Sequence, residues 1–433
     1  MKVLVNLLLL FSISLAFPSL KELEKENQKL SPSELNKTVK DNLKTELKYL
    51  NLFMQGYEQI KQNYVVDKPA KELFENALRG MLQKLDPYST LFTPQELKDF
   101  TEDTEGEFGG LGIEITKAKG GGILVITPLE GTPAWKAGIQ PGDIIVKVNN
   151  VTLGPDITVM KAVHLMRGKP GTKVTIWIKR KGWEKPKPFT LTRAVIKVKS
   201  VKYRVLDTKY GKIGYIKVTQ FQESTPKEFK KAILDLVNNK YVKGLIIDMR
   251  FNPGGLLSSA VSMVDMFVPK NKVVLKIKGK NEYEVYKSTH KPIIPKDIPV
   301  VVLVNQATAS AAEIFTGNLK DYKLATIVGE KTFGKGCVQN IFPLPYGYAV
   351  KLTTAYYYLP KGECIQGRGI KPDIEVKLSK KDKEFLKKLS EEEKKHPEKI
   401  LEYKKQRENY IDNQLKTAIE VIGKKLKEEG KLE

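Results

Sequence analysis

The sequence VVLVNQATASAAE, residues 301–313, joins an apolar run directly to a helical pattern. Its valines and leucine are typical of a buried strand, and the small residues that follow are typical of a helix start. Ser310 therefore falls at the N-terminus of the predicted helix, where free N–H groups and the helix dipole stabilise developing negative charge. The small Ala309 and Ala311 leave space for an incoming peptide backbone. The alternative is a capping box, in which Ser310 and Glu313 bond reciprocally to the backbone.

Strands and helices alternate on both sides of this stretch, from about residue 195 to residue 374. The predicted strands are 214–218, 243–249 and 300–304, and the predicted helices are 225–238, 256–268 and 309–322. Alternation of this kind is typical of an α/β core with at least partly parallel strands. Residues 106–196 instead contain short apolar runs between glycine-rich turns, which predict a β-rich domain.

A second reactive segment is KTFGKGCVQ, residues 331–339. Lys335 lies between glycines before an apolar strand, and burial there is expected to lower the pKa of its amine, as a general base requires. Strand alternation places Lys335, Cys337 and Gln339 on one side, so that Gln339 can hold the amine by a hydrogen bond. The alternative is a lysine that extends its charge into water.

A third segment is DMRFNPGGLL, residues 248–257, where a strand passes through a Pro-Gly-Gly turn into a helix. Glycines allow a backbone N–H to point at a ligand, as an oxyanion hole requires. A plain connection between strand and helix is the alternative.

The chain offers little for a metal or for a histidine-based mechanism. His164, His290 and His396 lie in separate segments, and Cys337 and Cys364 do not have zinc-ligand spacing. We therefore expect no metal and no cofactor, and lysine is the known alternative base for a serine nucleophile. Whether the two cysteines pair stays open.

The N-terminus is typical of an exported protein. Lys2 precedes VLVNLLLLFSISLA, an apolar run that ends at Ala16 and is short for a membrane span. We expect a signal peptide over residues 1–16 and a location in the periplasm or cell envelope, with an uncleaved signal anchor as the alternative. Residues 17–45 are interpreted as a polar linker or a loosely held arm, and residues 46–85 as two helices.

The net charge of +24 is strongly basic. The lysines are spread along the chain and alternate with glutamates, without a dense patch of interleaved aromatic residues. We therefore expect no nucleic-acid partner, while peripheral association with an anionic membrane stays open.

Together, the three segments resemble the C-terminal processing proteases, the tail-specific peptidases of family S41. The matching motifs are NPGGLL at 252–257, the serine segment at 307–314, FGKG with V-Q at 333–339, and IQGRGIKPDIEV at 365–376. FGGLGIEI at 108–115 and PAWKAGIQPGDII at 133–145 are similar to the PDZ domain of that family.

The resemblance implies a multidomain α/β protein. Its protease core is crotonase/ClpP-like, with an inserted β-rich PDZ domain and helical N- and C-terminal regions. The implied domains are a signal peptide at 1–16, a helical region at 17–105, the PDZ domain at 106–196, the core at 197–376 and a charged helical region at 377–433.

The resemblance also implies roles for single residues. Ser310 is the nucleophile, Lys335 is the base and Gln339 orients Lys335. Gly254 and the amide of Ala311 form the oxyanion hole. Asp321 lies where some relatives carry a supporting acid, and relatives often repeat serine where this chain has alanines around Ser310.

In the PDZ domain, an extended peptide C-terminus adds to the strand at 111–116 by backbone hydrogen bonds. The amides of Gly110, Leu111 and Gly112 receive its carboxylate. Leu111, Ile113 and Ile115 help to line an apolar pocket beside the helix 157–167. Arg167, which ends this helix, either couples tail binding to the active site or is a solvated arginine that interacts with the helix dipole.

These features predict an exported serine endopeptidase that binds protein or peptide substrates by their apolar C-termini. A non-catalytic PDZ scaffold that binds tails and a crotonase-like acyl-CoA enzyme are the alternatives. The physiological substrate and assembly into a homo-oligomer stay open.

Overall fold

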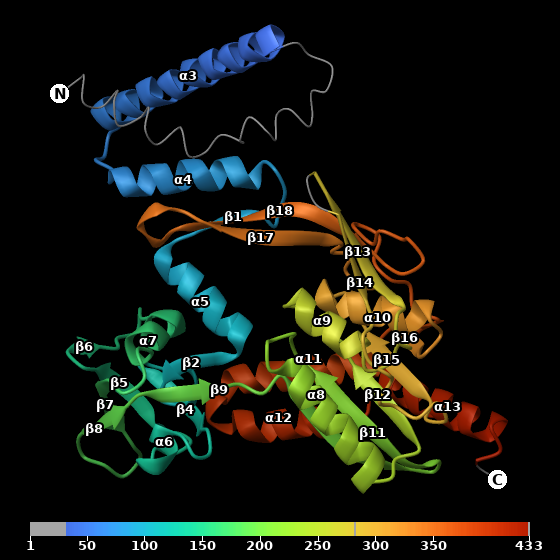
Figure 1. Ribbon diagram of the computed structural model, residues 1–433. Coiled ribbons are helices and arrows are strands. Elements are labelled where there is room, and N and C mark those ends of the chain that lie inside the picture. The colour runs from blue at the N-terminus through green and yellow to red at the C-terminus, as the bar shows by residue number, and fades with distance from the viewer. Residues whose placement is uncertain (1–31, 281–282, 432–433) are drawn as a thin grey trace. The chain divides into compact units, whose positions relative to one another are not determined.

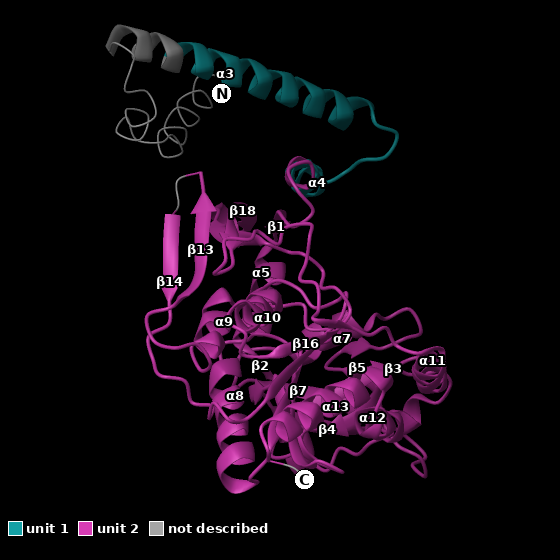
Figure 2. Ribbon diagram, turned by 90° about the vertical axis from the view of Figure 1, so that its right-hand side faces the viewer, with its two compact units in different colours: residues 1–80 teal, residues 81–433 magenta. Residues whose placement is uncertain are grey.

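The computed structural model describes residues 32–280 and 283–431, and the side chains of residues 32–39 are not described. The predicted signal peptide, residues 1–16, lies outside the described residues. The chain divides into two compact units, residues 1–80 and residues 81–433 (Figure 2). Within the described residues, no helix is long and apolar enough to cross a membrane.

The first unit consists of α3 (Pro32–Asn63) and most of α4 (Ala70–Gln83). The rings of Tyr57 and Phe74 pack together, with their centroids 4.7 Å apart. The interpretation of residues 17–45 as a linker is wrong for residues 32–45, which belong to α3. The leucines and lysines of that stretch are good helix formers, and the helix forms there without a strong apolar period.

The second unit is built on a six-stranded sheet (Figure 1). Its strands, in spatial order, are β10 (Val201–Thr208), β11 (Gly211–Val218), β12 (Gly244–Asp248), β15 (Val300–Val304), β16 (Thr326–Gly329) and β19 (Ile374–Glu375). β10 pairs antiparallel to β11, and all the other pairs are parallel. This arrangement confirms the predicted α/β core with partly parallel strands.

Helices cover both faces of this sheet. The helices on one face are α8 (Thr225–Leu234), α9 (Leu257–Val264) and α10 (Ala311–Asp321), and α13 (Asn413–Glu428) covers the other face. Successive side chains of β12 alternate between the two cores: Leu245 and Ile247 pack with the first set, and Ile246 packs with α13. A strand that is buried on both faces requires a continuous apolar sequence, which explains the apolar runs at 244–247 and 300–304.

A second, antiparallel sheet lies beside the core. It contains β1 (Thr90–Phe92), β13 (Val273–Gly279), β14 (Tyr283–Lys287), β17 (Cys337–Pro343) and β18 (Ala349–Tyr358). Because β1 pairs with β18, the chain just before residue 90 is brought to the segment that carries Lys335.

The β-rich part between the first helices and the core has its own hydrophobic cluster. Its main strands are β3 (Ile113–Lys117), β4 (Ile123–Pro128), β5 (Ile144–Val148), β7 (Lys173–Lys179) and β8 (Lys187–Thr192), and β6 (Val151–Thr152) pairs with β5. It also contains α6 (Pro133–Lys136), α7 (Val159–Met166), and the pair β2 (Glu107–Gly110) and β9 (Ala194–Lys197). The helix α5 (Pro94–Glu105) connects β1 to β2.

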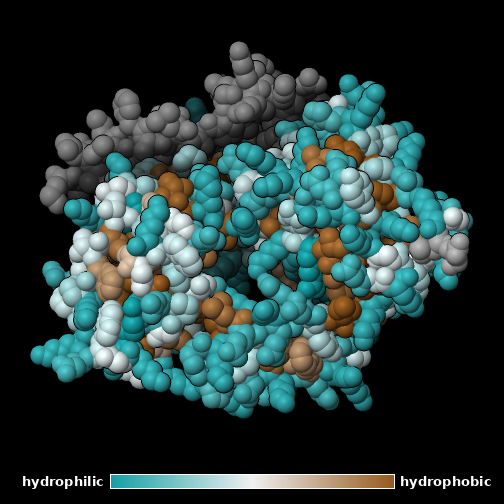
Figure 3. Space-filling view, turned by 90° about the horizontal axis from the view of Figure 1, so that it is seen from below, coloured by the Kyte–Doolittle hydropathy of each residue, from teal (hydrophilic) through white to brown (hydrophobic). Residues whose placement is uncertain are grey.

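Two charged helices, α11 (Lys380–Lys395) and α12 (Ile400–Asn409), precede α13. The ring of Phe385 stacks on that of Tyr410, with centroids 4.0 Å apart. The face of the molecule seen in Figure 3 is mostly hydrophilic, and its hydrophobic residues form separate patches. Ion pairs such as Lys202–Glu408 and Lys209–Glu420 compensate part of the positive charge locally.

Candidate active site

Ser310 is the residue at which the chain turns from β15 into α10. It has φ 55° and ψ −120°, which is an unfavourable conformation for a residue other than glycine. Its N–H donates to the Glu313 carboxylate at 2.9 Å, and the N–H of Ala309 donates to the carbonyl of Asn252 at 2.9 Å. The carboxylate half of the predicted capping box is therefore present, and the sharp turn at Ser310 is fixed from both sides.

Glu313 does more than cap the helix. Its carboxylate is completely buried and also accepts hydrogen bonds from the Thr332 hydroxyl at 2.5 Å and from the N–H groups of Gly334 at 2.7 Å and Lys335 at 2.9 Å. Burial raises the pKa of the Glu313 carboxyl, and these hydrogen bonds offset the effect only in part. One oxygen, Oε2, receives the N–H groups of both Ser310 and Lys335, so Glu313 brings the two candidate residues together.

Lys335 is half-buried at the end of the loop before β17. Desolvation lowers the pKa of its amine, and the nearby Cys337, Asp86 and Glu313 offset this only in part. Its Nζ lies 4.9 Å from the centroid of the Tyr88 ring. The predicted local burial of Lys335 is present, and its direction of pKa shift is the one that a general base requires.

One side of Lys335 is bounded by the turn at residues 86–89, which follows the two helices predicted for residues 46–85. The Asp86 carboxylate holds this turn by accepting from the N–H groups of Tyr88 and Ser89 at 2.7 and 2.8 Å. The Ser89 hydroxyl in turn accepts from the N–H of Thr353 on β18 at 3.1 Å. The signal that could have identified this boundary is Tyr88 in a tight turn between a helix and a strand, but its partner strand is more than 250 residues away.

Gln339 does not hold the amine of Lys335 in this structure. Its amide donates to Cys337 Sγ at 2.9 Å and to Thr353 Oγ1 at 3.3 Å, and no hydrogen bond joins it to Lys335 among the described residues. The β17–β18 register shifts between Val338 and Gln339, so strict alternation from Lys335 to Gln339 does not hold. Cys337 and Cys364 are both free thiols in this structure.

The glycine turn lies directly against the serine. A Cβ added to Gly254, which has φ +99°, would lie 2.7 Å from the Cβ of Ser310. The N–H of Gly254 donates to the side-chain oxygen of Asn252 at 2.9 Å, so it is not aimed at an open site. Ala311 is the first residue of α10, and within the described chain its N–H has no hydrogen-bond acceptor.

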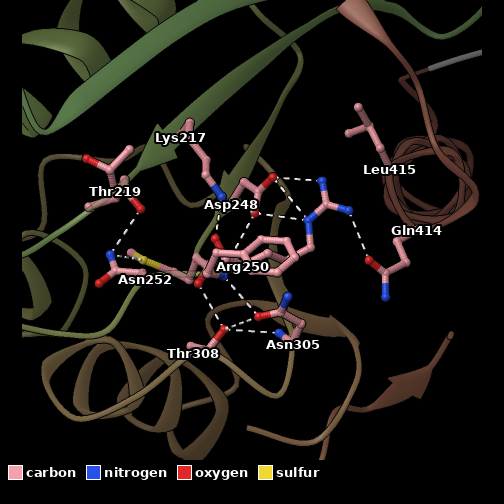
Figure 4. Close-up of polar contacts among 12 residues, drawn as sticks. Lys217, Thr219, Asp248, Arg250, Asn252, Asn305, Thr308, Gln414 and Leu415 are labelled. Atoms are coloured by element: carbon pink, nitrogen blue, oxygen red, sulfur yellow. Dashed lines mark hydrogen bonds and ion pairs between the residues drawn. The ribbon is translucent and has the colours of Figure 1, made fainter. Parts of the chain in front are cut away.

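A buried ion network surrounds the segment that leads into this turn, with Asp248 and Arg250 at its centre (Figure 4). Asp248, which is 1% exposed at the end of β12, pairs with Arg250 at 2.8 Å and with Lys217 at 3.1 Å. Arg250 reaches onward to Asp412 at 2.7 Å, next to the start of α13. Burial by itself would raise the pKa of Asp248, but the charges of Arg250 and Lys217 outweigh it and hold the pKa well below its usual range. The sequence does not reveal this network, because its members come from three segments that are far apart in the chain.

Asp321 lies at the far end of α10 from Ser310. Its carboxylate accepts from the N–H of Lys361 at 3.1 Å, and burial raises its pKa.

The three histidines each pair with a carboxylate: His164 with Asp99, His290 with Asp265 and His396 with Glu398. Among the described residues, no group of three or more His, Cys, Asp or Glu could hold a metal ion.

The predicted tail site lies at β3, which is an edge strand paired only with β4. Leu111 is buried at 3% exposure and Ile113 is half-buried, and both pack in the β-rich core. Gly110 pairs with Ala194 in the short β2–β9 ladder. The carbonyls of Leu111 and Gly112 accept hydrogen bonds from the N–H groups of Ala134 and Leu129. Within the described chain, the N–H groups of Leu111 and Gly112 have no hydrogen-bond acceptor.

Arg167 is not the solvated arginine of the alternative interpretation. It donates to the Glu102 carboxylate of α5 at 2.9 Å, and its guanidinium lies 4.0 Å from the centroid of the Phe108 ring. His164, three residues earlier on α7, pairs with Asp99 of α5 at 2.9 Å. The predicted tail-binding helix is thus joined by two side-chain contacts to α5, the helix that follows β1.

Comparison with known proteins identifies three parts of the chain. Residues 212–376 match the model of peptidase family S41, residues 124–180 match a PDZ domain, and residues 9–94 match the N-terminal domain of the activating protease CtpB. Among solved structures, the Photosystem II D1 C-terminal processing protease is similar at 29% identity and a TM-score of 0.45, over 75% of this chain and 86% of that one.

Relatives with assigned names are similar over most of the chain. A carboxy-terminal-processing protease of Bartonella bacilliformis is 42% identical over 340 residues, which cover 78% of this chain and 77% of the relative. A probable CtpA-like serine protease of Staphylococcus epidermidis is 39% identical over 80% of this chain and 68% of the relative. This chain therefore belongs to peptidase family S41 and is a C-terminal processing peptidase with a PDZ domain.

Proposed function

We propose that this protein is an exported serine endopeptidase in which Ser310 attacks the scissile carbonyl and Lys335 is the general base. The observation that carries the proposal is the shared Glu313 oxygen, which accepts from the N–H groups of Ser310 and Lys335, each at 2.9 Å. In this mechanism the neutral amine of Lys335 takes the hydroxyl proton as the serine oxygen bonds to the carbonyl carbon. The ammonium then returns the proton to the leaving amine, and water releases the acyl group in a second, similar step.

The N-terminus of α10 supports charge stabilisation during attack. The free N–H of Ala311 points from the first helical turn, where the helix dipole also favours an oxyanion. Gly254 contributes as a second donor if substrate binding releases its hydrogen bond to Asn252. Gln339 orients the base indirectly, because its amide packs on Cys337, which is adjacent to the Lys335 amine.

Covalent labelling tests this function directly. A fluorophosphonate probe should label the wild-type protein at Ser310, and peptide mapping identifies the modified residue. A PDZ scaffold without catalysis and a crotonase-like acyl-CoA enzyme would both leave Ser310 unlabelled. The parallel sheet with helices on both faces supports a crotonase/ClpP-like description of the core, so the labelling result and not the fold separates these alternatives.

We expect activity to rise with pH through the lowered pKa of Lys335. The base acts only when it is neutral, so the rate is low below that pKa and reaches a plateau above it. The measurement is kcat/KM between about pH 5 and 10 with a peptide for which the chemical step is limiting. A flat profile over this range would contradict Lys335 as the base.

Selection of substrates by their tails is supported by the free edge of β3 and by the unpartnered N–H groups of Leu111 and Gly112. A bound tail would extend the sheet at β3, and its carboxylate would accept from these N–H groups. We expect peptides that end in Ala-Ala to be cleaved at least about tenfold faster than those that end in Asp-Asp, because the apolar end is buried. C-terminal amidation of the Ala-Ala peptide is the control, and equal cleavage of all three peptides would exclude tail selection.

Export to the periplasm or cell envelope is proposed from residues 1–16. Fractionation of cells that express the chain with and without these residues tests it. Cytoplasmic recovery of the full-length chain would contradict the proposal.

A further inference from the structure

Tyr357 of β18 contacts the backbones of both Ser310 and Lys335. Its side chain is 1% exposed, yet its hydroxyl lies 2.6 Å from the carbonyl oxygen of Lys335 and 3.2 Å from that of Ser310. Its backbone N–H also donates to the carbonyl of Gly336 at 2.9 Å. One buried residue therefore joins the strand β18 to both candidate catalytic segments.

Tyr357 and Glu313 bind opposite backbone groups of the same two residues, Ser310 and Lys335. The N–H groups of Ser310 and Lys335 donate to the Glu313 carboxylate, and their carbonyls meet the Tyr357 hydroxyl. Each candidate residue is thus held through the peptide groups on both of its sides, while its side chain remains available. This matters most for Ser310, because its positive φ is unfavourable for a residue with a side chain and persists only where the surroundings enforce it.

We propose that Tyr357 is a positioning residue for the reaction: its hydroxyl, opposite the Glu313 carboxylate, fixes the spacing between the nucleophile and the base. This proposal rests on the proposed roles of Ser310 and Lys335. The Tyr357 hydroxyl transfers no proton to the substrate. Burial raises the pKa of this phenol well above its ordinary value, so it remains a hydrogen-bond donor throughout the working range of the enzyme.

Loss of the Tyr357 hydroxyl is expected to change the pKa of the Lys335 amine, which can be measured as a shift of the pH profile. Without it, the carbonyl of Lys335 loses its donor, and the loop can shift to find water. The Lys335 amine is then better hydrated, and its pKa returns toward the ordinary value for lysine. A purely structural role for Tyr357 would reduce the amount of folded enzyme but would leave the pH profile of the folded fraction unchanged.

The pH profile reports on Lys335 because Tyr357→Phe changes none of the titratable groups that interact with its amine. They are Asp86 and Tyr88 of the turn before β1, Glu313 of α10, Cys337 of β17 and Lys351 of β18.

The test compares full-length wild type, Tyr357→Phe and Tyr356→Phe, with rates divided by the amount of enzyme that a fluorophosphonate titrates. Tyr356 lies on the same strand, but its side chain is 46% exposed, which makes it the matched control. We expect Tyr357→Phe to lower kcat by about 100-fold with KM within about twofold, because a small misplacement of reacting groups has effects of that size. Its activity should also rise at higher pH than that of the wild type, and Tyr356→Phe should behave as the wild type does.

Two results would overturn the positioning role: an unchanged normalised kcat, or a lower kcat with an unshifted pH profile. If Tyr357→Phe does not fold, Glu313→Gln is the second test. It replaces one of the carboxylate oxygens that accept from the backbone on the other side of Ser310 and Lys335, at nearly constant side-chain volume. The normalised labelling rate of Glu313→Gln should fall at least about tenfold, and an unchanged rate would overturn the proposal. Ser310→Ala distinguishes failure of the proposed function from failure of the role of Tyr357. If Ser310→Ala retains cleavage, the proposed function is wrong. If Ser310→Ala is inactive and Tyr357→Phe has wild-type activity, only the role of Tyr357 is rejected.

Discussion

Ser310→Ala and Lys335→Ala are each expected to lower peptidase activity by about 10⁴-fold or more, since each removes a group that the reaction cannot replace. Both variants should stay folded. Alanine already occupies the positions on either side of Ser310, and the backbone bonds of Lys335 to Glu313 and Tyr357 do not need its side chain. Cleavage of an unfolded protein such as casein measures the activity, and thermal melting checks the fold.

An exposed serine and an exposed lysine serve as matched controls for the two substitutions. Ser262 on α9 and Lys331 in the loop before Lys335 are both exposed, so Ser262→Ala and Lys331→Ala should keep wild-type activity. Lys335→Arg distinguishes a base from a mere positive charge, because a guanidinium keeps its proton at every accessible pH. It should be as inactive as Lys335→Ala. Substantial activity in Lys335→Arg or in Ser310→Ala would reject the proposed mechanism.

The core could be predicted because its evidence is local in sequence. A strand such as β15 is buried on both faces, which demands the uninterrupted apolar run at 300–304. The helix that follows begins at small residues, and Ser310 lies at its start as predicted. Parallel neighbours place the chain that follows β12 beside the chain that follows β15, so the glycine turn and the serine had to meet at one edge of the sheet.

The rest of the site depends on pairings that no local pattern contains. Tyr88 reaches Lys335 only because β1 pairs with β18, and Tyr357 reaches both candidate catalytic segments from that same strand. Strict strand alternation predicts that Gln339 lies on the same side as Lys335. The β17–β18 register shifts between Val338 and Gln339, so that alternation does not hold. Glu313 was recognised as half of a capping box, but a carboxylate has two oxygens, and its other donors come from the loop at 332–335.

The ion network around the segment before the glycine turn leads to the second large effect, which concerns stability. Asp248→Ala should lower the free energy of unfolding by about 3–5 kcal/mol, because it leaves buried cations without their shared counter-ion. Both Arg250 and Lys217 lose that partner, and the Tyr215 hydroxyl, 2.7 Å from the carboxylate, loses its acceptor. Urea denaturation followed by circular dichroism measures the change.

Asp248→Asn separates charge from shape in the same network. The amide fills the same space and can still accept one set of hydrogen bonds, but it cannot neutralise Arg250 and Lys217. If charge pairing dominates, Asp248→Asn should be nearly as destabilised as Asp248→Ala, whereas an almost wild-type stability would show that packing and hydrogen bonding suffice. Asp207→Ala, an exposed acid on β10 of the same sheet, should change the stability by less than about 0.5 kcal/mol. Because Arg250 lies only four residues before Gly254, which contacts Ser310, the same loss of support should also reduce the rate of Ser310 labelling in molecules that remain folded.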